Sequence, residues 1–373
     1  MSAVPTGTTD RSPHPRGARL ARMTVVQPDG RKVYLYGAFQ PPPGSYQPPA
    51  LTGGEWQQRW NPLRQEWVMY ASGRQGRTFL PERSACPLCP STEGHSTEIP
   101  ASAYDAAVFE NRFPAVRSGA PTGPLPPGAK PSAGVSEVVV YTDRHEGSFG
   151  TLAADRLDGL VEIWADRYRE LGQRSDVGYV FIFENRGEAV GVTLHHPHGQ
   201  IMGYPLVPPV PSIELAAAAR HQRRTGTCMH CTLAADERRA KVRVILDQDG
   251  ILSYVPFSAR WPYEVHVVPT RHVGALPDAS PAVRRALGRS LQQVARAYDR
   301  LFDAPMPYMM ALHQRPTDER DHPEAHLHVE FYPILRDAGK QKYLAGSEAA
   351  AGVFVNDTLP EQKAAELRGV LRT

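Results

Sequence analysis

The sequence predicts an α+β protein in which one unit, a mostly antiparallel sheet with helices packed on it, occurs twice in tandem. Three markers recur in the same order in the two halves of the chain: a C-x-x-C pair, a histidine that follows an apolar run, and an H-x-H pair. The second copies follow the first at 142, 127 and 130 residues: Cys228 after Cys86, His272 after His145 and His326 after His196. Because the order and the approximate spacing are both kept, we infer an internal duplication.

Composition is that of a soluble globular protein and excludes several classes of function. The 373 residues suffice for one large or two medium domains, and the count of 36 prolines is the one unusual value. The formal charge of +3, with no concentrated basic stripe, argues against nucleic-acid binding. No apolar run reaches membrane-spanning length, and the N-terminus lacks the apolar core of a signal peptide. We therefore expect a cytoplasmic protein that binds neither nucleic acid nor membrane.

The duplication divides the chain into three segments: an N-terminal extension over residues 1–54, a first unit over 55–204 and a second unit over 205–373. Residues 1–22 are rich in Pro, Gly, Ser, Thr and Arg, which predicts a disordered tail. A short strand is expected at residues 33–36. The proline-rich residues 40–54 should form a linker.

The first unit shows the periodicities of short strands and one helix. Apolar and aromatic runs typical of strands lie at residues 67–70, 138–141 and 179–183. Residues 157–171 carry apolar side chains at helical spacing. After the last strand the chain should turn at 184–188 and return as a strand at 190–196.

The second unit repeats this order after a stiff, proline-rich linker at residues 205–211. A helix is expected at 213–224, with Ser212 as its N-cap. A strand at 265–272 and a helix at 282–301 then mirror the first unit. Strands at 308–312 and 329–332 flank the second H-x-H pair, and residues 356–372 predict a terminal helix.

The centre of the first unit is the run His196-Pro197-His198-Gly199-Gln200. Two histidines one residue apart point the same way on extended backbone, and Pro197 biases His196 toward that geometry. We expect Gly199 to let the backbone approach a bulky ligand closely, and Gln200 to add an amide donor. This pattern predicts a cradle for a phosphate with an imidazole nucleophile inside it. The alternative is an ordinary surface or core histidine pair.

This run and the segment Phe183-Glu184-Asn185-Arg186-Gly187 resemble the active-site motif of the galactose-1-phosphate uridylyltransferases, a family within the histidine-triad superfamily. Triad hydrolases carry a third histidine where this chain has Gln200, which favours the transferase branch. The resemblance covers roughly residues 59–368. It implies two histidine-triad-like halves that form one continuous antiparallel sheet, and a homodimer whose sites are shared between subunits.

All four cysteines fall in the two C-x-x-C pairs, and in a reducing compartment such pairs bind metal more often than they form disulfides. The order of ligands in the family implies a first zinc site made of Cys86, Cys89, His145 and His196. Four protein ligands leave no open position, so this Zn²⁺ should be structural and should hold the loop that places His198. The duplication predicts a second structural zinc site made of Cys228, Cys231, His272 and His326. The alternative for that set is an inactive remnant with a thiol pair.

Some members of the family have a further iron or zinc site, built from a glutamate and three histidines. The resemblance places Glu214, His313 and His328 on three of these ligands. Glu330 stands where the family has the remaining histidine. We therefore expect a remnant of this site, for Zn²⁺ or Fe²⁺, with an altered ligand set.

The resemblance implies that His198 is the catalytic nucleophile and that Gln200 assists it. A neutral imidazole would attack the α-phosphorus of UDP-glucose, release glucose 1-phosphate, and pass UMP from the uridylyl-histidine to galactose 1-phosphate. The other ring nitrogen of His198 should donate to a backbone carbonyl, which fixes the tautomer. Gln200 would hydrogen-bond a non-bridging phosphoryl oxygen.

The remaining family positions predict residues that bind the substrate. The phosphates and ribose would be contacted by Arg74, Arg77, Asn111, Asn185 and Thr193, with the alternative that the two arginines are solvated loop residues and Asn185 forms a turn. Thr193 replaces the more usual serine and keeps the hydroxyl. The hexose phosphate would be contacted by Lys342, Tyr343 and Glu348, although Ser347 replaces the family's tyrosine before the glutamate.

Two other functions fit parts of this pattern. A related nucleoside diphosphate-sugar or dinucleoside-polyphosphate phosphorylase would use the same histidine but pass the nucleotide to inorganic phosphate. A binding protein with zinc knuckles as interaction modules would form no covalent histidine intermediate and would not need Gln200.

Overall fold

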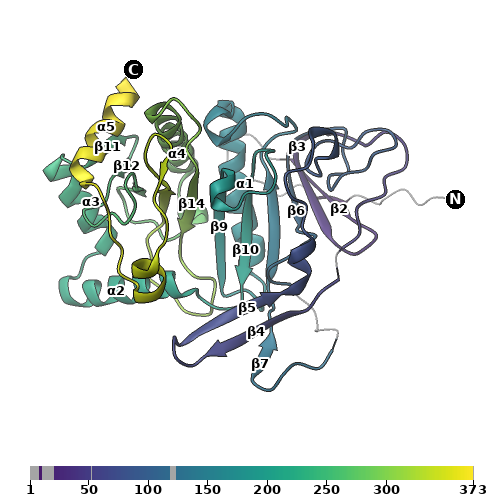
Figure 1. Cartoon of the computed structure of the whole chain (residues 1–373), viewed down its shortest axis with the longest axis horizontal. Helices are drawn as coiled ribbons and strands as arrows, with labels where there is room; N and C mark the ends of the chain where they lie inside the picture. The colour runs from purple at the N-terminus through teal and green to yellow at the C-terminus, as the bar shows by residue number, and fades with distance from the viewer. Residues whose placement is uncertain (1–7, 11–20, 52, 118–122, 373) are drawn as a thin grey trace.

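The computed structural model describes residues 8–10, 21–51, 53–117 and 123–372. A twelve-stranded antiparallel sheet runs through the molecule (Figure 1). In spatial order its strands are β1 (Thr8–Asp10), β2 (Arg22–Val26), β3 (Lys32–Gln40), β6 (Ala103–Glu110), β8 (Val135–Val140), β10 (His198–Tyr204), β9 (Tyr179–Arg186), β14 (Tyr308–His313), β15 (His328–Pro333), β13 (Val265–Pro269), β12 (Ile251–Tyr254) and β11 (Val244–Gln248).

The strand order itself displays the duplication. From the middle outwards, β9, β10, β8 and β6 on one side correspond to β14, β15, β13 and β12 on the other. The two series meet where β9 pairs with β14, with Glu184 opposite Met310. The predicted α+β class with two tandem units in one continuous sheet is confirmed.

Helices cover the sheet and complete each unit. The long helices are α1 (Ala154–Gly172), α2 (Pro209–Thr225), α3 (Met229–Ala240), α4 (Pro281–Leu301) and α5 (Pro360–Arg372). Helices α1 and α4, the equivalent elements of the two halves, pack on the same face of the sheet and contact each other. Among the described residues, no helix is both long enough and apolar enough to cross a membrane.

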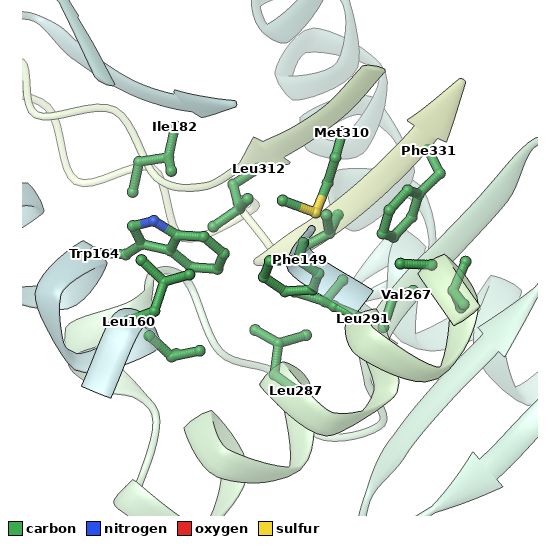
Figure 2. Packing of buried hydrophobic residues seen from close by; sticks show 14 of the residues in the cluster. Phe149, Leu160, Trp164, Ile182, Val267, Leu287, Leu291, Met310, Leu312 and Phe331 are labelled. Carbon is green, nitrogen blue, oxygen red and sulfur yellow. The ribbon is translucent and has the colours of Figure 1, made fainter. Parts of the chain in front are cut away.

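One apolar core lies between α1, α4 and the sheet, and it is shared by both halves (Figure 2). The ring of Trp164 on α1 stacks on Phe149 at 6.1 Å, and Leu287 and Leu291 of α4 close the same cluster. Helix α4 begins after Ser280, whose hydroxyl accepts a hydrogen bond from the amide of Val283 (3.3 Å).

Buried charges tie the N-terminal strands to α1. The guanidinium of Arg167 pairs with Glu137 of β8 at 2.6 Å and lies over the ring of Tyr34. Arg22 of β2 pairs with the half-buried carboxylates of Asp166 (3.0 Å) and Glu170 (2.5 Å) on α1. The strands β2 and β3 therefore belong to the main sheet and are not a loosely attached extension.

Smaller elements surround this frame. A three-stranded sheet formed by β4 (Trp56–Asn61), β5 (Glu66–Ala71) and β7 (Ala129–Pro131) projects from the main sheet (Figure 1). The short pair β16 (Leu335–Asp337) and β17 (Lys340–Gln341) precedes a π-helical turn at Ser347–Ala351. The remaining turns are 3₁₀ segments at Ser72–Gly76, Arg83–Ala85, Phe149–Thr151, Glu188–Val190 and Leu276–Asp278.

Several sequence predictions differ from the structure. The return strand expected at 190–196 is wrong, because these residues form a 3₁₀ turn and a loop, and β10 begins at His198. Helix α2 begins at Pro209, so Ser212 is no N-cap; its hydroxyl donates to the carbonyl of Val207 (3.2 Å). The terminal helix begins at Pro360, because Asn356 instead donates its amide to the carbonyl of Ala259.

The N-terminal prediction is tested only in part. Within the tail expected at residues 1–22, positions 1–7 and 11–20 lie outside the described residues, and Thr8–Asp10 and Arg22 belong to strands. The strand expected at 33–36 is part of β3. The predicted strand at 265–272 ends earlier, at Pro269, which leaves His272 on a loop.

Candidate active site and metal centres

The first candidate metal centre lies at the entry to β10. The Nε2 atom of His196 is 2.7 Å from the carbonyl oxygen of Thr142, which accepts only, so Nε2 carries the proton and the lone pair is on Nδ1. That Nδ1 faces the sulfurs of Cys86 (3.9 Å) and Cys89 (3.6 Å). His145 completes the group, with its Nδ1 3.3 Å from the sulfur of Cys89.

This donor set fits a tetrahedral zinc ion. The four donor atoms all lie within 4.8 Å of one another, and around Zn²⁺ they would be roughly 3.5 Å apart. Burial and the neighbouring Cys86 raise the pKa of the Cys89 thiol to about 12, so a bound cation would have to displace its proton. The carbonyl of Thr142 fixes the orientation of His196 and would be an outer partner of a metal bound there.

The second centre repeats this arrangement in the other half. The Nε2 atom of His326 faces the carbonyl of Pro269 at 3.0 Å, and its Nδ1 faces the sulfurs of Cys228 (3.3 Å) and Cys231 (3.6 Å). His272 lies edge-on to the His326 ring and belongs to the same compact group of donors. The second set of ligands therefore fits a structural metal as well as the first does.

The third cluster brings together Glu214, His313 and His328, as the sequence predicted. Glu214 accepts a hydrogen bond from Nδ1 of His313 at 2.7 Å and lies 4.0 Å from Nε2 of His328. That Nε2 is buried without a hydrogen-bond partner among the described residues, and it lies 3.7 Å from Glu330. A cation could be held here by two imidazoles and two carboxylates.

Sequence reasoning missed the groups that surround this cluster. His266, opposite Glu330 in the pairing of β13 with β15, forms contacts with Glu330 (3.2 Å) and Glu264 (3.0 Å). His230, inside the second C-x-x-C pair, stacks on His328 at 4.2 Å. The alternation of side chains along β13 and β15 is the signal that could have placed His266 beside Glu330.

His198 is the first residue of β10 and has the predicted hydrogen bond. Its Nδ1 is 2.7 Å from the carbonyl oxygen of His196, so Nδ1 carries the proton and Nε2 keeps its lone pair. Burial lowers the pKa of His198, which favours the neutral ring. The two histidines of the H-x-H pair thus use opposite nitrogens: His196 presents Nδ1 to the cysteines, and His198 keeps Nε2 available.

A cleft opens beside His198, with a cavity of about 100 Å³. Seven residues that the sequence assigned to catalysis or to the nucleotide line it: Arg74, Arg77, Asn111, Asn185, Thr193, His198 and Gln200. Asn185 lies on β9 and not in a turn, so the alternative role for it is wrong. Arg77 is exposed, whereas Arg74 is half-buried and donates to the carbonyl of Phe113 (2.7 Å).

The inner wall of this cleft contains residues that were not predicted from the sequence. Pro87, Leu88, Phe109 and Val138 form an apolar surface next to the first metal centre. The carboxylate of Glu98 lies at the same end and pairs with Arg31 (2.8 Å) and Arg112 (3.3 Å). Arg112 directly follows Asn111 in the chain, which is the one signal that could have indicated this wall.

The residues predicted to bind the hexose phosphate do not line this cleft. Among the described residues, the lining of the cleft includes none of Lys342, Tyr343 and Glu348. Lys342 is buried and pairs with Glu348 at 3.0 Å, whereas the Tyr343 side chain is 72% exposed. Within one chain, this segment therefore does not line the cleft beside His198.

Gly199 is constrained from the interior of the protein, a requirement that the sequence did not predict. A side chain at this position would overlap the hydroxyl oxygen of Tyr141 and come within 3.1 Å of the carbonyl oxygen of Phe183. The Phe183 oxygen belongs to β9, and Tyr141 directly follows β8. Glycine is required at this position because Tyr141 packs closely against β10 on the face away from the cleft.

Together, the duplicated sheet, the paired C-x-x-C/histidine centres and an H-x-H histidine beside a polar cleft define a protein built from two tandem copies of one α+β unit, with the cleft in the first copy. Comparisons with known proteins then specify the family. Residues 52–208 match the family described as galactose-1-phosphate uridyl transferase, N-terminal domain, and residues 214–372 match its C-terminal domain. The chain belongs to the galactose-1-phosphate uridylyltransferase family.

Individual relatives agree with this assignment. The galactose-1-phosphate uridylyltransferase of Thermotoga maritima is 38% identical over 83% of this chain and 97% of its own length. That of Streptomyces lividans is 36% identical over 79% of this chain and 82% of its own. A solved uridylyltransferase structure superposes with a TM-score of 0.75 at 30% identity, covering 85% of this chain and 98% of the other. An ADP-glucose phosphorylase from Arabidopsis thaliana, with a TM-score of 0.65 at 22% identity over 83% of this chain and 98% of its own, shares the fold.

Proposed function

We propose that this protein transfers UMP from UDP-glucose to galactose 1-phosphate through a uridylyl-histidine on His198. The observation that carries the proposal is the hydrogen bond from Nδ1 of His198 to the carbonyl of His196, which leaves Nε2 with a lone pair beside the cleft. Membership of the family supports the choice of substrates.

The reaction is a double displacement. Nε2 of His198 attacks the α-phosphorus of UDP-glucose, the P–N bond forms, and the bond to glucose 1-phosphate breaks. Galactose 1-phosphate then attacks the same phosphorus, displaces His198 and leaves as UDP-galactose. Because the leaving group is a phosphate in the first step, no strong general acid is required.

The residues that line the cleft suit these steps. The Gln200 amide, on the same face of β10 as His198, can donate to a non-bridging phosphoryl oxygen as charge develops. Arg74 and Arg77 supply positive charge for the phosphates. The polar side chains of Asn185 and Thr193 serve the phosphates, and Asn111 serves the ribose.

The metals have a supporting role in this proposal. We assign structural Zn²⁺ to the Cys86 and Cys228 groups, and Zn²⁺ or Fe²⁺ to the group of Glu214, His313 and His328. The ion at the first centre would hold His196 and therefore the carbonyl that fixes the His198 tautomer. The free thiols of all four cysteines suit a reducing cytoplasm, where we place the protein.

We further infer that the protein works as a homodimer, with Lys342, Tyr343 and Glu348 of one subunit completing the cleft of the other. Each chain exposes two groups of apolar side chains: Trp60, Leu63, Val68, Tyr70 and Phe79 around the β4–β5 hairpin, and Tyr343, Leu344, Val353 and Val355 near the C-terminus. A dimer would cover such surfaces. It would also explain why the C-terminal segment lies apart from His198 within one chain.

Mixed dimers test the sharing of sites. Chains carrying His198→Ala and chains carrying Lys342→Ala should each be inactive alone. Co-expressed, they should regain activity, because one site of the mixed dimer then has both intact residues. If the mixture stays as inactive as its components while the pure variants form dimers, the shared site is wrong.

A labelling experiment tests the reaction. UDP-glucose carrying ³²P in the uridylyl phosphate should leave acid-labile, base-stable label on the protein, and galactose 1-phosphate should discharge it. Discharge by inorganic phosphate, after labelling from ADP-glucose, would instead indicate the phosphorylase alternative. Absence of label from either donor would leave a binding function.

A further inference from the structure

A carboxyl group is buried directly behind the strand that carries His198. Glu184 on β9 is 4% exposed, and each of its carboxyl oxygens accepts one hydrogen bond, from the hydroxyl of Tyr141 (2.8 Å) and from that of Tyr308 (3.0 Å). Its neighbour Asn185 lines the cleft. Because side chains alternate along a strand, Glu184 lies on the opposite face, within the shared core.

Tyr141 connects this carboxyl group to the H-P-H-G-Q run. Its backbone amide donates to the carbonyl of Pro197 (3.2 Å), between the two histidines. Its hydroxyl occupies the space that a side chain at position 199 would need, between His198 and Gln200. The same residue therefore contacts the run on both sides of His198.

Tyr308 connects the carboxyl group to the other half of the molecule. This residue begins β14, the strand through which the second unit joins the first, and its side chain is fully buried. Its ring packs against Tyr298 and Phe331 and is approached by the guanidinium of Arg186, which pairs with Asp299 (2.6 Å). Glu184 thus bridges the two halves at their junction.

Burying the carboxyl group of Glu184 has an energetic cost, and filling space in the core does not by itself account for it. Burial raises the pKa of Glu184 to about 7, and the two tyrosine hydroxyls and Arg186 only partly oppose this rise. A well-packed apolar side chain could fill such a place without desolvating a carboxyl group. A buried, fully hydrogen-bonded group at this place can instead define one geometry for the strands around it.

We propose that Tyr141, Glu184 and Tyr308 are positioning residues for the uridylyl transfer, which they serve by fixing the backbone of Gly199 from behind. This inference rests on the proposed function of His198. With Gly199 fixed, Nε2 of His198 and the amide of Gln200 are held in alignment toward the same phosphorus. Displacements of about 1 Å at a reacting centre cost on the order of a hundredfold in rate.

Tyr141→Phe tests this positioning role, because the substitution removes the hydroxyl and leaves the ring in the core. We expect the single-turnover rate of His198 uridylylation at saturating UDP-glucose to fall about tenfold to a hundredfold, with the Kd for UDP-glucose unchanged. Tyr298→Phe is the matched control. It also removes a fully buried hydroxyl from this core, one that donates to the carbonyl of Tyr263 (2.8 Å), and should leave the rate unchanged.

A double-mutant cycle tests the contact itself. Gly199→Ala alone should lower the transfer rate, because the new methyl group overlaps the Tyr141 hydroxyl. In the Tyr141→Phe background the further loss should be smaller, since that overlap is gone. Strictly additive losses would overturn the proposal, as would a Tyr141→Phe rate equal to that of the unaltered chain.

Replacements of Glu184 keep the proposal falsifiable if Tyr141→Phe does not fold. Glu184→Gln keeps two hydrogen-bonding groups at the same place and should lose less rate than Glu184→Leu, which leaves both hydroxyls without an acceptor. Zinc content and thermal unfolding, measured on every variant, identify losses that come from unfolding. Equal transfer rates for both Glu184 variants and the unaltered chain would overturn the proposal.

Labelling of the unaltered chain distinguishes a failure of the proposed function from a failure of the positioning role. If it forms no uridylyl-histidine, the proposed function fails and this inference fails with it. If the unaltered chain and the variants form the intermediate at the same rate, only the positioning role is wrong.

Discussion

At the scale of single residues, protonation of two neighbouring imidazoles divides their roles. His196 has its proton on Nε2 and His198 has its proton on Nδ1, because each faces a backbone carbonyl that can only accept. One ring therefore has a lone pair that a metal could bind, and the other has its lone pair beside the cleft. The alternation of the H-x-H pair was readable from the sequence, but the carbonyl of Thr142 that fixes the first ring was not.

Gln200 gives a prediction at this scale. Gln200→Ala should lower the rate of His198 uridylylation by about 10² to 10³, because a hydrogen-bond donor aimed at developing phosphoryl charge is lost. The measurement is single-turnover labelling with UDP-glucose, with His198→Ala as the variant that forms no label. A Gln200→Ala variant that labels at the unaltered rate would remove Gln200 from the mechanism.

The two cysteine centres offer a matched pair of variants. Cys86→Ser and Cys228→Ser should each reduce the zinc content measured by atomic emission. Only Cys86→Ser should also abolish labelling of His198, because a metal bound by the Cys86 group would hold His196, whereas one bound by the Cys228 group would hold His326 in the other half. Equal effects of the two changes on labelling would contradict this division.

At the scale of elements, the sequence predicts the main strands and helices well and their ends poorly. Periodicity identified α1 and α4 because both bury one face against the sheet. It misplaced the return strand, since residues 191–197 form no strand and His198 is where pairing with Val140 begins. Periodicity could not reveal that the hydroxyl of Tyr141 requires a glycine at position 199, because Tyr141 lies just after β8, far from Gly199 in the sequence.

The attachment of the N-terminal strands predicts a pH effect. Burial alone would raise the pKa of Glu170, but the charges of Arg167 and Arg22 and hydrogen bonds hold it at about 2, below the ordinary value of 4.5. A depressed carboxylate pKa contributes stability above about pH 4.5 that is lost as the pH falls toward 2. Glu170→Gln should therefore lower the unfolding midpoint at pH 7 more than at pH 3. A pH-independent difference in midpoint would contradict this assignment.

At the scale of the whole molecule, both halves share one sheet and one core, so they should unfold together. Trp164 on α1 packs in the cluster that includes Leu287 and Leu291 of α4. Trp164→Ala should cost about 3–5 kcal/mol of the free energy of unfolding. Circular dichroism and tyrosine fluorescence during denaturant unfolding should give coincident transitions for this variant and for the unaltered chain. Two separated transitions would mean that each half is stable alone.

The overall arrangement was readable from three repeated markers, but the complete site was not. The order of the C-x-x-C pairs and H-x-H pairs indicated the duplication, and the cleft contains the residues expected for the nucleotide. Lys342, Tyr343 and Glu348 do not line that cleft, although the resemblance implied that they bind the same substrate. No local pattern in the sequence indicates that they lie outside its lining.

The most direct test of the account is to locate the covalent intermediate. The protein would be quenched at high pH after brief exposure to UDP-glucose, digested, and its peptides sequenced by mass spectrometry. We expect a uridylyl group on the peptide that contains His198, attached to His198 itself and absent after addition of galactose 1-phosphate. A uridylyl group on another residue, or none in a protein that still turns over substrate, would contradict the central role of the neutral His198 ring.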